Sequence, residues 1–185
     1  MEVYKNPSGE FTPEEELYAA YVKDHIAKVQ KSFNERGHML GRVLQLSHDG
    51  MSELAKRVAE HDQSKWSVDE FPQYRNYFYP AEGEVKVDEQ FAAAWKHHYE
   101  ANDHHPEHWV INRVATDMSI LAIAEMILDW EAMSRNFGGN PRVWFRDSKN
   151  KFNISVATEV IVSRALSILY TEDLNLKEYR NPILG

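Results

Sequence analysis

The sequence predicts an all-α protein, and three kinds of observation support this fold class. Apolar side chains recur every three to four residues along several segments, which is the spacing of the buried face of a helix. Residues that begin helices precede these segments, as in the capping box of Thr12, Pro13 and Glu15. Residues that end helices follow them, as Gly138 and Gly139 do. We expect one domain over 1–185 that contains a bundle of about six helices.

The same signals give the expected order of the elements. A core over about 13–137 contains five helices, with Gly37 ending the first and an ordered, aromatic loop over 71–83. A second capping box is expected from Ser67 to Glu70. The C-terminal part, 142–170, adds a small hairpin and a last helix. The expected ranges are helices over 13–36, 39–46, 51–66, 88–100, 110–136 and 155–170, and a hairpin over 142–152.

Composition limits the function classes. The 185 residues carry a formal charge of −8, which argues against a protein that coats duplex nucleic acid by charge alone. The N-terminus has no apolar signal-peptide core, and no apolar run approaches the ~18 residues of a membrane span. We therefore expect a cytoplasmic protein without a membrane partner. Because the sequence contains no cysteine but nine histidines, any metal must be held by nitrogen and oxygen ligands.

Six ionisable residues lie on the apolar faces of the expected helices: His25, His61, Asp62, His98, Glu125 and Asp129. Burying such groups without partners costs several kcal/mol each. We therefore expect them to meet one another in the core. Imidazoles and carboxylates that converge inside a helical bundle are typical of a divalent metal site.

Further histidines compete for places in this site. His97 and His98 cannot both face inward, because neighbours on a helix differ by ~100°. His98 is preferred, since it shares a face with apolar residues of the same segment. At least one histidine of the segment 102–109 is expected to bind metal. His105 is slightly favoured over His104, and His108 is the remaining alternative.

Each assignment has a plainer interpretation. His25 can be an ordinary core histidine, and His38 or His48 can take its place as a ligand. Asp129 can be a paired structural carboxylate, with Asp117 as its rival. The aromatic segment 74–79 can cover a pocket or simply fill the bundle.

The motif around His61 and Asp62 resembles the HD superfamily of metal-dependent phosphohydrolases. In that family a first histidine precedes an adjacent His-Asp pair, and a distant aspartate follows. Here His25 resembles the first histidine, 36 residues before His61, and Asp129 resembles the last aspartate. The run His61-Asp62-Gln63-Ser64-Lys65 is similar to the His-Asp-x-x-Lys variant, in which two metals and additional histidines are frequent.

Two further comparisons refine the resemblance. The His-His pairs are similar in position to those of the cyclic-dinucleotide phosphodiesterase branch, but the Gly-Tyr-Pro motif of that branch is absent. The segments 61–65, 102–109 and 125–130 resemble a family of uncharacterised phage and bacterial proteins with an HD-like core. This second resemblance covers residues 20–140 approximately, and it does not indicate which reaction the protein catalyses.

The resemblance implies a metal-dependent phosphohydrolase that acts on a nucleotide or another phosphate ester through a metal-activated hydroxide. One or two divalent ions (Mn, Fe, Co, Ni or Zn) would be held by His25, His61, Asp62, His98, His104, His105 and Asp129. Lys65 would bind a phosphoryl oxygen, and Glu125 would orient a ligand, accept a proton or form a structural ion pair. The alternatives are a diiron oxygenase on the same fold and a non-catalytic phage module that binds a nucleotide or a protein.

Overall fold

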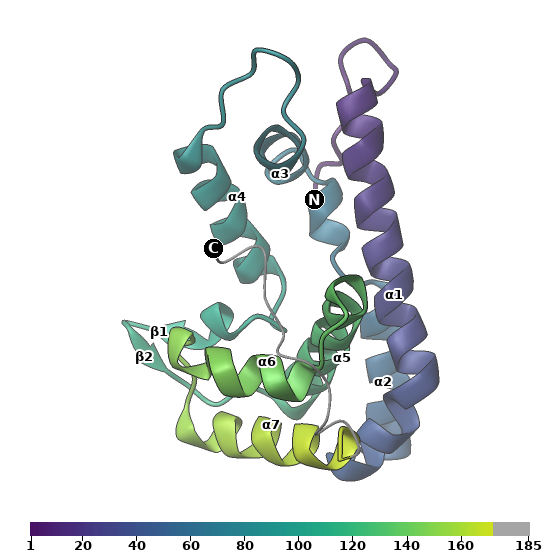
Figure 1. The fold of residues 1–185 in the computed structure, drawn as a ribbon, viewed down its shortest axis with the longest axis vertical. Coiled ribbons are helices and arrows are strands. Elements are labelled where there is room, and N and C mark those ends of the chain that lie inside the picture. Colours follow the sequence, from purple (N-terminus) through teal and green to yellow (C-terminus); the bar gives the residue numbers. More distant parts are fainter. Residues whose placement is uncertain (172–185) are drawn as a thin grey trace.

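A computed structural model gives the arrangement of residues 1–171 (Figure 1). These residues form a mostly helical structure with one small hairpin, so the predicted all-α class is confirmed. The helices are α1 (Pro13–Val43), α2 (His48–Ala59), α3 (Phe71–Phe78), α4 (Asp88–Ala101), α5 (Ile120–Phe137), α6 (Pro141–Ser148) and α7 (Val156–Leu169). Short 3₁₀ helices cover Gln63–Trp66, Pro106–Trp109 and Lys149–Lys151. The strands β1 (Val110–Ile111) and β2 (Val114–Ala115) pair antiparallel, with Val110 opposite Ala115.

Helix α1 begins where the sequence predicts and is longer than predicted. The capping box is present, because Thr12 Oγ1 accepts from the Glu15 amide and the Glu15 carboxylate accepts from the Thr12 amide. Gly37, however, does not end the helix, so the expected helices 13–36 and 39–46 are one element. A β-carbon at Gly37 would lie 2.7 Å from the Phe33 ring. The glycine therefore allows close packing within the helix.

Three other predicted boundaries were wrong. Helix α2 stops at Ala59, which leaves His61 and Asp62 in the turn that follows instead of inside a helix over 51–66. Residues 71–78 form helix α3 rather than a loop. The expected capping box there is absent, since Glu70 is the N-cap residue and makes no side-chain cap.

The hairpin lies elsewhere than predicted. Strands β1 and β2 occupy the expected start of the long helix, because Asn112 and Arg113 adopt positive φ angles of 52° and 68°. Two successive residues of this kind form the tight turn that matches strand twist. Helix α5 therefore begins only at Ile120, after the Ser119 cap. The expected hairpin at 142–152 is helical instead, because Asn140 caps α6 and Pro141 occupies its first turn.

The core consists of two clusters that meet along α1. The larger cluster surrounds α5 and includes Val29 and Ile123, whereas the smaller one surrounds Phe71 and includes Val22. His25 lies on α1 between Val22 and Val29, so its side chain reaches the space between the clusters. Figure 1 shows α1 along the whole length of the molecule, with α3 and α4 near one end and α6 and α7 near the other.

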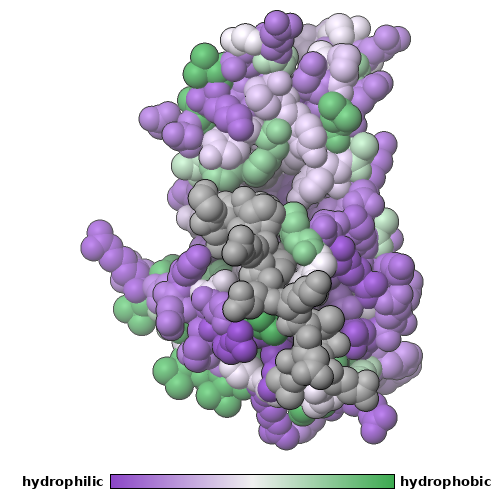
Figure 2. All heavy atoms as spheres, viewed as in Figure 1, coloured by the Kyte–Doolittle hydropathy of each residue, from purple (hydrophilic) through white to green (hydrophobic). Residues whose placement is uncertain are grey.

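On the face shown in Figure 2, hydrophilic side chains cover most of the described surface, and apolar side chains occur singly or in small groups. Among residues 1–171, no helix is both long and apolar enough to span a membrane.

Candidate metal centre

Asp62 lies at the centre of the buried cluster, in the turn between α2 and the 3₁₀ helix Gln63–Trp66. Its backbone is left-handed, with φ 56° and ψ 23°, a conformation that aspartate tolerates better than most residues. The Lys65 amide donates to the Asp62 carbonyl at 3.0 Å and closes the turn. This local geometry directs a carboxylate that is 2% exposed into the interior.

One oxygen of this carboxylate faces the histidines of α1 and of the turn. Asp62 Oδ2 lies 3.3 Å from His25 Nε2, 3.4 Å from His61 Nε2 and 2.7 Å from Lys65 Nζ. Asp129, from α5, completes this side. Its Oδ1 lies 3.2 Å from His25 Nε2 and 4.0 Å from His61 Nε2.

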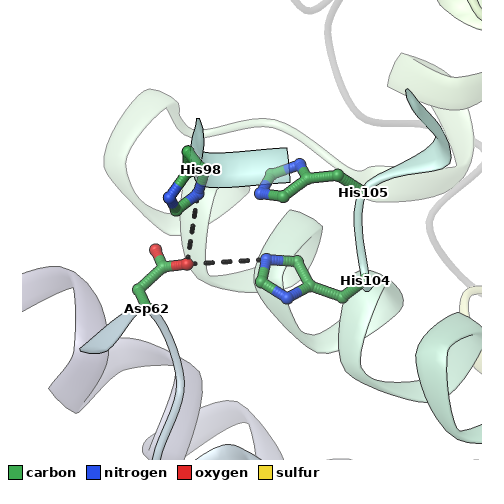
Figure 3. Close-up of side chains that lie close together, drawn as sticks. All are labelled: Asp62, His98, His104 and His105. Atoms are coloured by element: carbon green, nitrogen blue, oxygen red, sulfur yellow. Dashed lines mark ion pairs between the residues drawn. The ribbon is translucent and has the colours of Figure 1, made fainter. Parts of the chain in front are cut away.

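The other oxygen faces a second set of histidines (Figure 3). Asp62 Oδ1 lies 3.4 Å from His98 Nε2 and 3.5 Å from His104 Nε2. A nitrogen of His105 belongs to the same group, in which all four potential ligand atoms lie within 4.8 Å of one another. The two oxygens of Asp62 therefore face different histidines. A third group of potential ligand atoms, from His61, His104 and Asp129, lies within 4.8 Å of one another and links the two sides.

Glu125 orients two of these imidazoles from behind. Its Oε1 lies 2.8 Å from His61 Nδ1 and 3.3 Å from His104 Nδ1. A carboxylate at Nδ1 favours a proton on that nitrogen, which leaves the Nε2 lone pair facing Asp62. The Nε group of Arg57 donates to the other oxygen of Glu125 at 2.8 Å.

Glu70 plays the same part for His98, and the sequence did not predict it. Glu70 is fully buried, and its two carboxylate oxygens lie 2.8 Å from His98 Nδ1 and 2.7 Å from His97 Nδ1. His97 thus faces away from Asp62, whereas His98 points at it, as the helical geometry predicted. No spacing pattern indicates Glu70, because it lies 28 residues from His98 in a segment expected to be a helix cap and loop.

The protonation states within the cluster suit cation binding. Burial alone would raise the pKa of Asp62, but the nearby His61 and Lys65 hold it well below its usual value. The pKa values of Glu125 and Asp129 are also lowered by their histidine partners, against the effect of burial. Burial lowers the pKa of His98 and His105. Ionised carboxylates and neutral imidazoles are the forms that bind metals.

His25 and His104 differ from these two histidines. Burial and the charge of Lys65 lower the pKa of His25, but hydrogen bonds with Asp129 and Asp62 outweigh them and raise it to about 9. Burial also opposes the raised pKa of His104, which results from its hydrogen bond with Glu125 and the charge of Asp62. A cation that binds His25 near neutral pH must therefore displace a proton.

Buried polar atoms without hydrogen-bond partners test whether a metal fits this cluster. Three such atoms are Asp62 Oδ1, His104 Nε2 and His105 Nε2. Each unsatisfied buried atom costs about 1–3 kcal/mol. Ligands about 2.1 Å from one ion lie roughly 3.0–3.4 Å from each other in octahedral or tetrahedral geometry. The separations of 3.3–3.5 Å between Asp62 and the histidines are close to this range, whereas His61 Nε2 lies farther, at 4.0 Å, from Asp129 Oδ1.

The structure brings together every site residue that the sequence predicts. His25, His61, Asp62, His98, His104, His105 and Asp129 supply the potential ligand atoms, with Lys65 and Glu125 in contact with them. Both His104 and His105 lie in the cluster, so the two alternatives that the sequence left open do not exclude each other. The role of these residues as ligands stays a prediction.

The rival residues lie outside the cluster. His38, His48 and His108 are exposed. Asp117 accepts a hydrogen bond from Ser155 Oγ at 2.6 Å, near the N-terminus of α7.

A cavity of about 220 Å³ leads to the cluster. His25, Asp62, Lys65, His98 and Asp129 contribute to its floor, and aromatic side chains of α1, α3 and α4 line its walls. The segment 74–79 contributes Tyr74 and Phe78 to this lining. The site is therefore buried but accessible from one side.

The fold and this site define an all-helical protein with a buried histidine–aspartate cluster suited to divalent cations. The chain belongs to the family of unknown function DUF5662, whose model matches residues 14–169 and so includes the entire cluster. No curated protein and no solved structure matches the chain.

Proposed function

We propose that this protein is a metal-dependent phosphohydrolase of the HD type that hydrolyses a phosphate ester. The observation that supports the proposal best is the position of Asp62, whose two oxygens face two separate sets of imidazole nitrogens. A carboxylate in this position is suited to bridge two divalent ions. Such paired ions acidify a bound water and stabilise both the attacking and the leaving oxygen of phosphoryl transfer.

The ligands divide into two sets in this proposal. His25, His61 and Asp129 would hold one ion together with Asp62 Oδ2. His98, His104 and His105 would hold the other together with Asp62 Oδ1. Both sets consist of nitrogen and oxygen donors, which suits Mn, Fe, Co, Ni or Zn.

Two residues beside the ligands have chemistry of their own. Lys65 lies on the cavity wall with its ammonium group 2.7 Å from Asp62 Oδ2. It is placed to bind a phosphoryl oxygen and to offset the negative charge that develops there. Glu125 is a positioning residue, since its carboxylate holds the Nδ1 protons of His61 and His104.

Oxygen activation is a second candidate function. The observation that favours it is the number of imidazoles, because a histidine-rich nitrogen and oxygen donor set also suits iron. A phosphohydrolase consumes a phosphate ester and water, whereas an oxygenase consumes dioxygen. Assays for phosphate release and for oxygen uptake therefore distinguish the two functions.

The first experiment measures the metal content of untagged protein by plasma mass spectrometry. We expect close to two equivalents of transition metal in the wild type. Asp62→Asn keeps the shape of the side chain but removes the bridging charge, so it should hold one equivalent or less. Asp49→Asn makes the same chemical change at an exposed position of α2 and should retain both ions.

The loaded protein is then assayed for phosphate release from phosphate esters and for oxygen uptake with iron. Phosphate release that is lost in Asp62→Asn supports the proposal. Oxygen uptake without phosphate release would replace it by the oxygenase. Failure to bind Mn, Fe, Co, Ni or Zn would exclude both and favour a non-catalytic binding module.

A further inference from the structure

A second cavity adjoins the one above the cluster and has a different character. Its volume is about 450 Å³, roughly twice that of the first. The two cavities share Trp95, His105, Asp129 and Met133 in their walls. A molecule bound at Asp129 and His105 can therefore extend from the cluster into the second cavity.

Aromatic side chains of α5, α6 and the following segment build the far wall of this second cavity. The rings of Trp130 and Trp144 lie 4.8 Å apart between centroids, and Phe152 lies 5.4 Å from Trp144 and 5.9 Å from Trp130. Rings held by mutual contact form a preorganised apolar wall.

The charges of the lining restrict what can bind. Among residues 1–171, the linings of the two cavities contain two lysines and no arginine, namely Lys65 beside Asp62 and Lys151 in the second cavity. The anions Asp62, Asp129 and Glu107 line the same space. Two metal ions with Lys65 suit one phosphoryl group, but these described linings offer a polyphosphate tail no further cluster of cations.

We propose that the substrate is a phosphomonoester with an apolar alcohol part, in which the phosphoryl group binds at the cluster and the apolar part occupies the second cavity. This inference rests on the proposed function. Met133 lines both cavities, so its side chain lies where they adjoin. The apolar part would be recognised by burial against aromatic rings, which gains affinity with each methylene that leaves water.

Alkylphosphonates test this inference, because their carbon–phosphorus bond resists hydrolysis and binding is measured without turnover. Methyl-, butyl- and octylphosphonate are titrated into manganese-loaded protein, with calorimetry and tryptophan fluorescence as readouts. Trp95, Trp130 and Trp144 in the walls make fluorescence a direct probe of occupancy. We expect up to about fourfold tighter binding per methylene until the cavity is filled.

Two alternative substitutions of Met133 and one control substitution localise the effect. Met133→Trp fills the junction of the cavities and should abolish the dependence on chain length while methylphosphonate still binds. Leu17→Trp adds a tryptophan at an exposed position of α1 and should behave as wild type. Met133→Asn, which places a polar amide at the junction, should weaken the dependence and replaces Met133→Trp if that variant does not fold.

The results separate this inference from the proposed function. Affinity that does not depend on chain length in the wild type would overturn the inference, even if esters are hydrolysed. A dependence that is unchanged in Met133→Trp and Met133→Asn would also overturn it, because the apolar part would then bind elsewhere. If the midpoint of the phosphonate titration varied with protein concentration, a second copy of this chain would be competing for the cavity. That result would overturn the inference and assign the cavity to self-association. Phosphate release from esters tests the proposed function separately.

Discussion

Oε2 of Glu70 lies 2.8 Å from Nδ1 of His98, on the side of the ring opposite to Asp62. The Asn102 amide also lies near this nitrogen, but it donates to Ser64 Oγ and to the His98 carbonyl, both at 2.7 Å. Ser64 Oγ lies 3.2 Å from the same nitrogen, and the closer Glu70 carboxylate, which can only accept, favours the proton on Nδ1. The Nε2 lone pair of His98 is then free to face Asp62.

Glu70→Gln tests this relationship. We expect the affinity for one of the two ions to fall about 10- to 100-fold, which is typical when the carboxylate behind a histidine ligand is lost. The ion at His25 and His61 should be retained, because Glu70 does not contact that side. The measurement is metal titration of the metal-free protein by calorimetry.

The control is Glu89→Gln, which makes the same change at an exposed position in the first turn of α4. Equal loss of both ions in Glu70→Gln would show that the variant perturbs the whole fold. Unchanged binding of both ions would show that His98 is not a ligand.

Local signals explain how much of the fold was predictable. The α1 start, α4 and α7 were predicted to within one or two residues, because the caps of α1 and α7 and the apolar spacing of α4 are sequence-local. Gly37 misled the prediction because a glycine inside a helix and one at its end look alike until the Phe33 ring that it contacts is known. The turn at Asn112 and Arg113 carries no glycine, so no signal separates β1 and β2 from the start of α5.

The candidate site was more predictable than the helix boundaries. Ligand candidates such as His25 and Asp129 were found because a polar residue on an apolar face needs a partner. Glu70 and Arg57 could not be found in this way. Each lies in a segment where a charged residue is expected anyway, as a helix cap or on a solvent-facing side of a helix. Their contacts with His98 and Glu125 depend on how the helices pack, which is long-range information.

The stability of the metal-free protein should depend on pH through His25. The folded-state pKa of His25 is raised from 6.5 to about 9. Its contribution, about 3 kcal/mol, is fully present below pH 6.5 and is lost as pH rises through about 9. The raised pKa of His104 acts in the same direction. The lowered pKa values of His98 and His105 raise stability only up to about pH 6.5.

Urea unfolding in chelator at pH 6.5 and 9.5 measures this effect as a fall in the free energy of unfolding. His25→Gln should remove most of the fall, whereas His38→Gln, an exposed histidine of α1, should not. Metal affinity should rise over the same interval, because the cation no longer competes with a proton. A free energy of unfolding that is the same at pH 6.5 and 9.5 would contradict the hydrogen bonds assigned to His25.

Arg57 should contribute to stability by pairing with Glu125 behind the cluster. Arg57→Met leaves a buried carboxylate without its partner and also breaks the ion pair with Asp103. We expect a loss of about 2–3 kcal/mol, which is below the range for a fully buried pair because the Arg57 side chain is 22% exposed. Urea unfolding of the metal-free protein gives the value, with Lys56→Met on the exposed side of α2 as the control.

A double variant separates pairing from packing. Arg57→Met combined with Glu125→Gln also removes the charge of Glu125, so that only the partly exposed Asp103 is left without its arginine partner. It should therefore be less destabilised than the sum of the two single variants. Simple additivity would indicate that Arg57 acts through packing alone.

Lys65 should act on the reaction more than on metal binding. Its ammonium group contacts Asp62 Oδ2 and lies on the cavity wall. Lys65→Gln removes the charge but keeps a polar side chain, so we expect both ions to stay bound. If Lys65 stabilises charge on the phosphoryl group, kcat should fall about 100- to 1,000-fold, the range for losing one such donor. Steady-state phosphate release and metal content, measured on the same sample, test this.

Lys23→Gln, at an exposed position of α1, is the control for a change of net charge. Loss of a metal ion in Lys65→Gln would instead give the lysine a structural role in holding Asp62, and an unchanged kcat would remove it from the reaction.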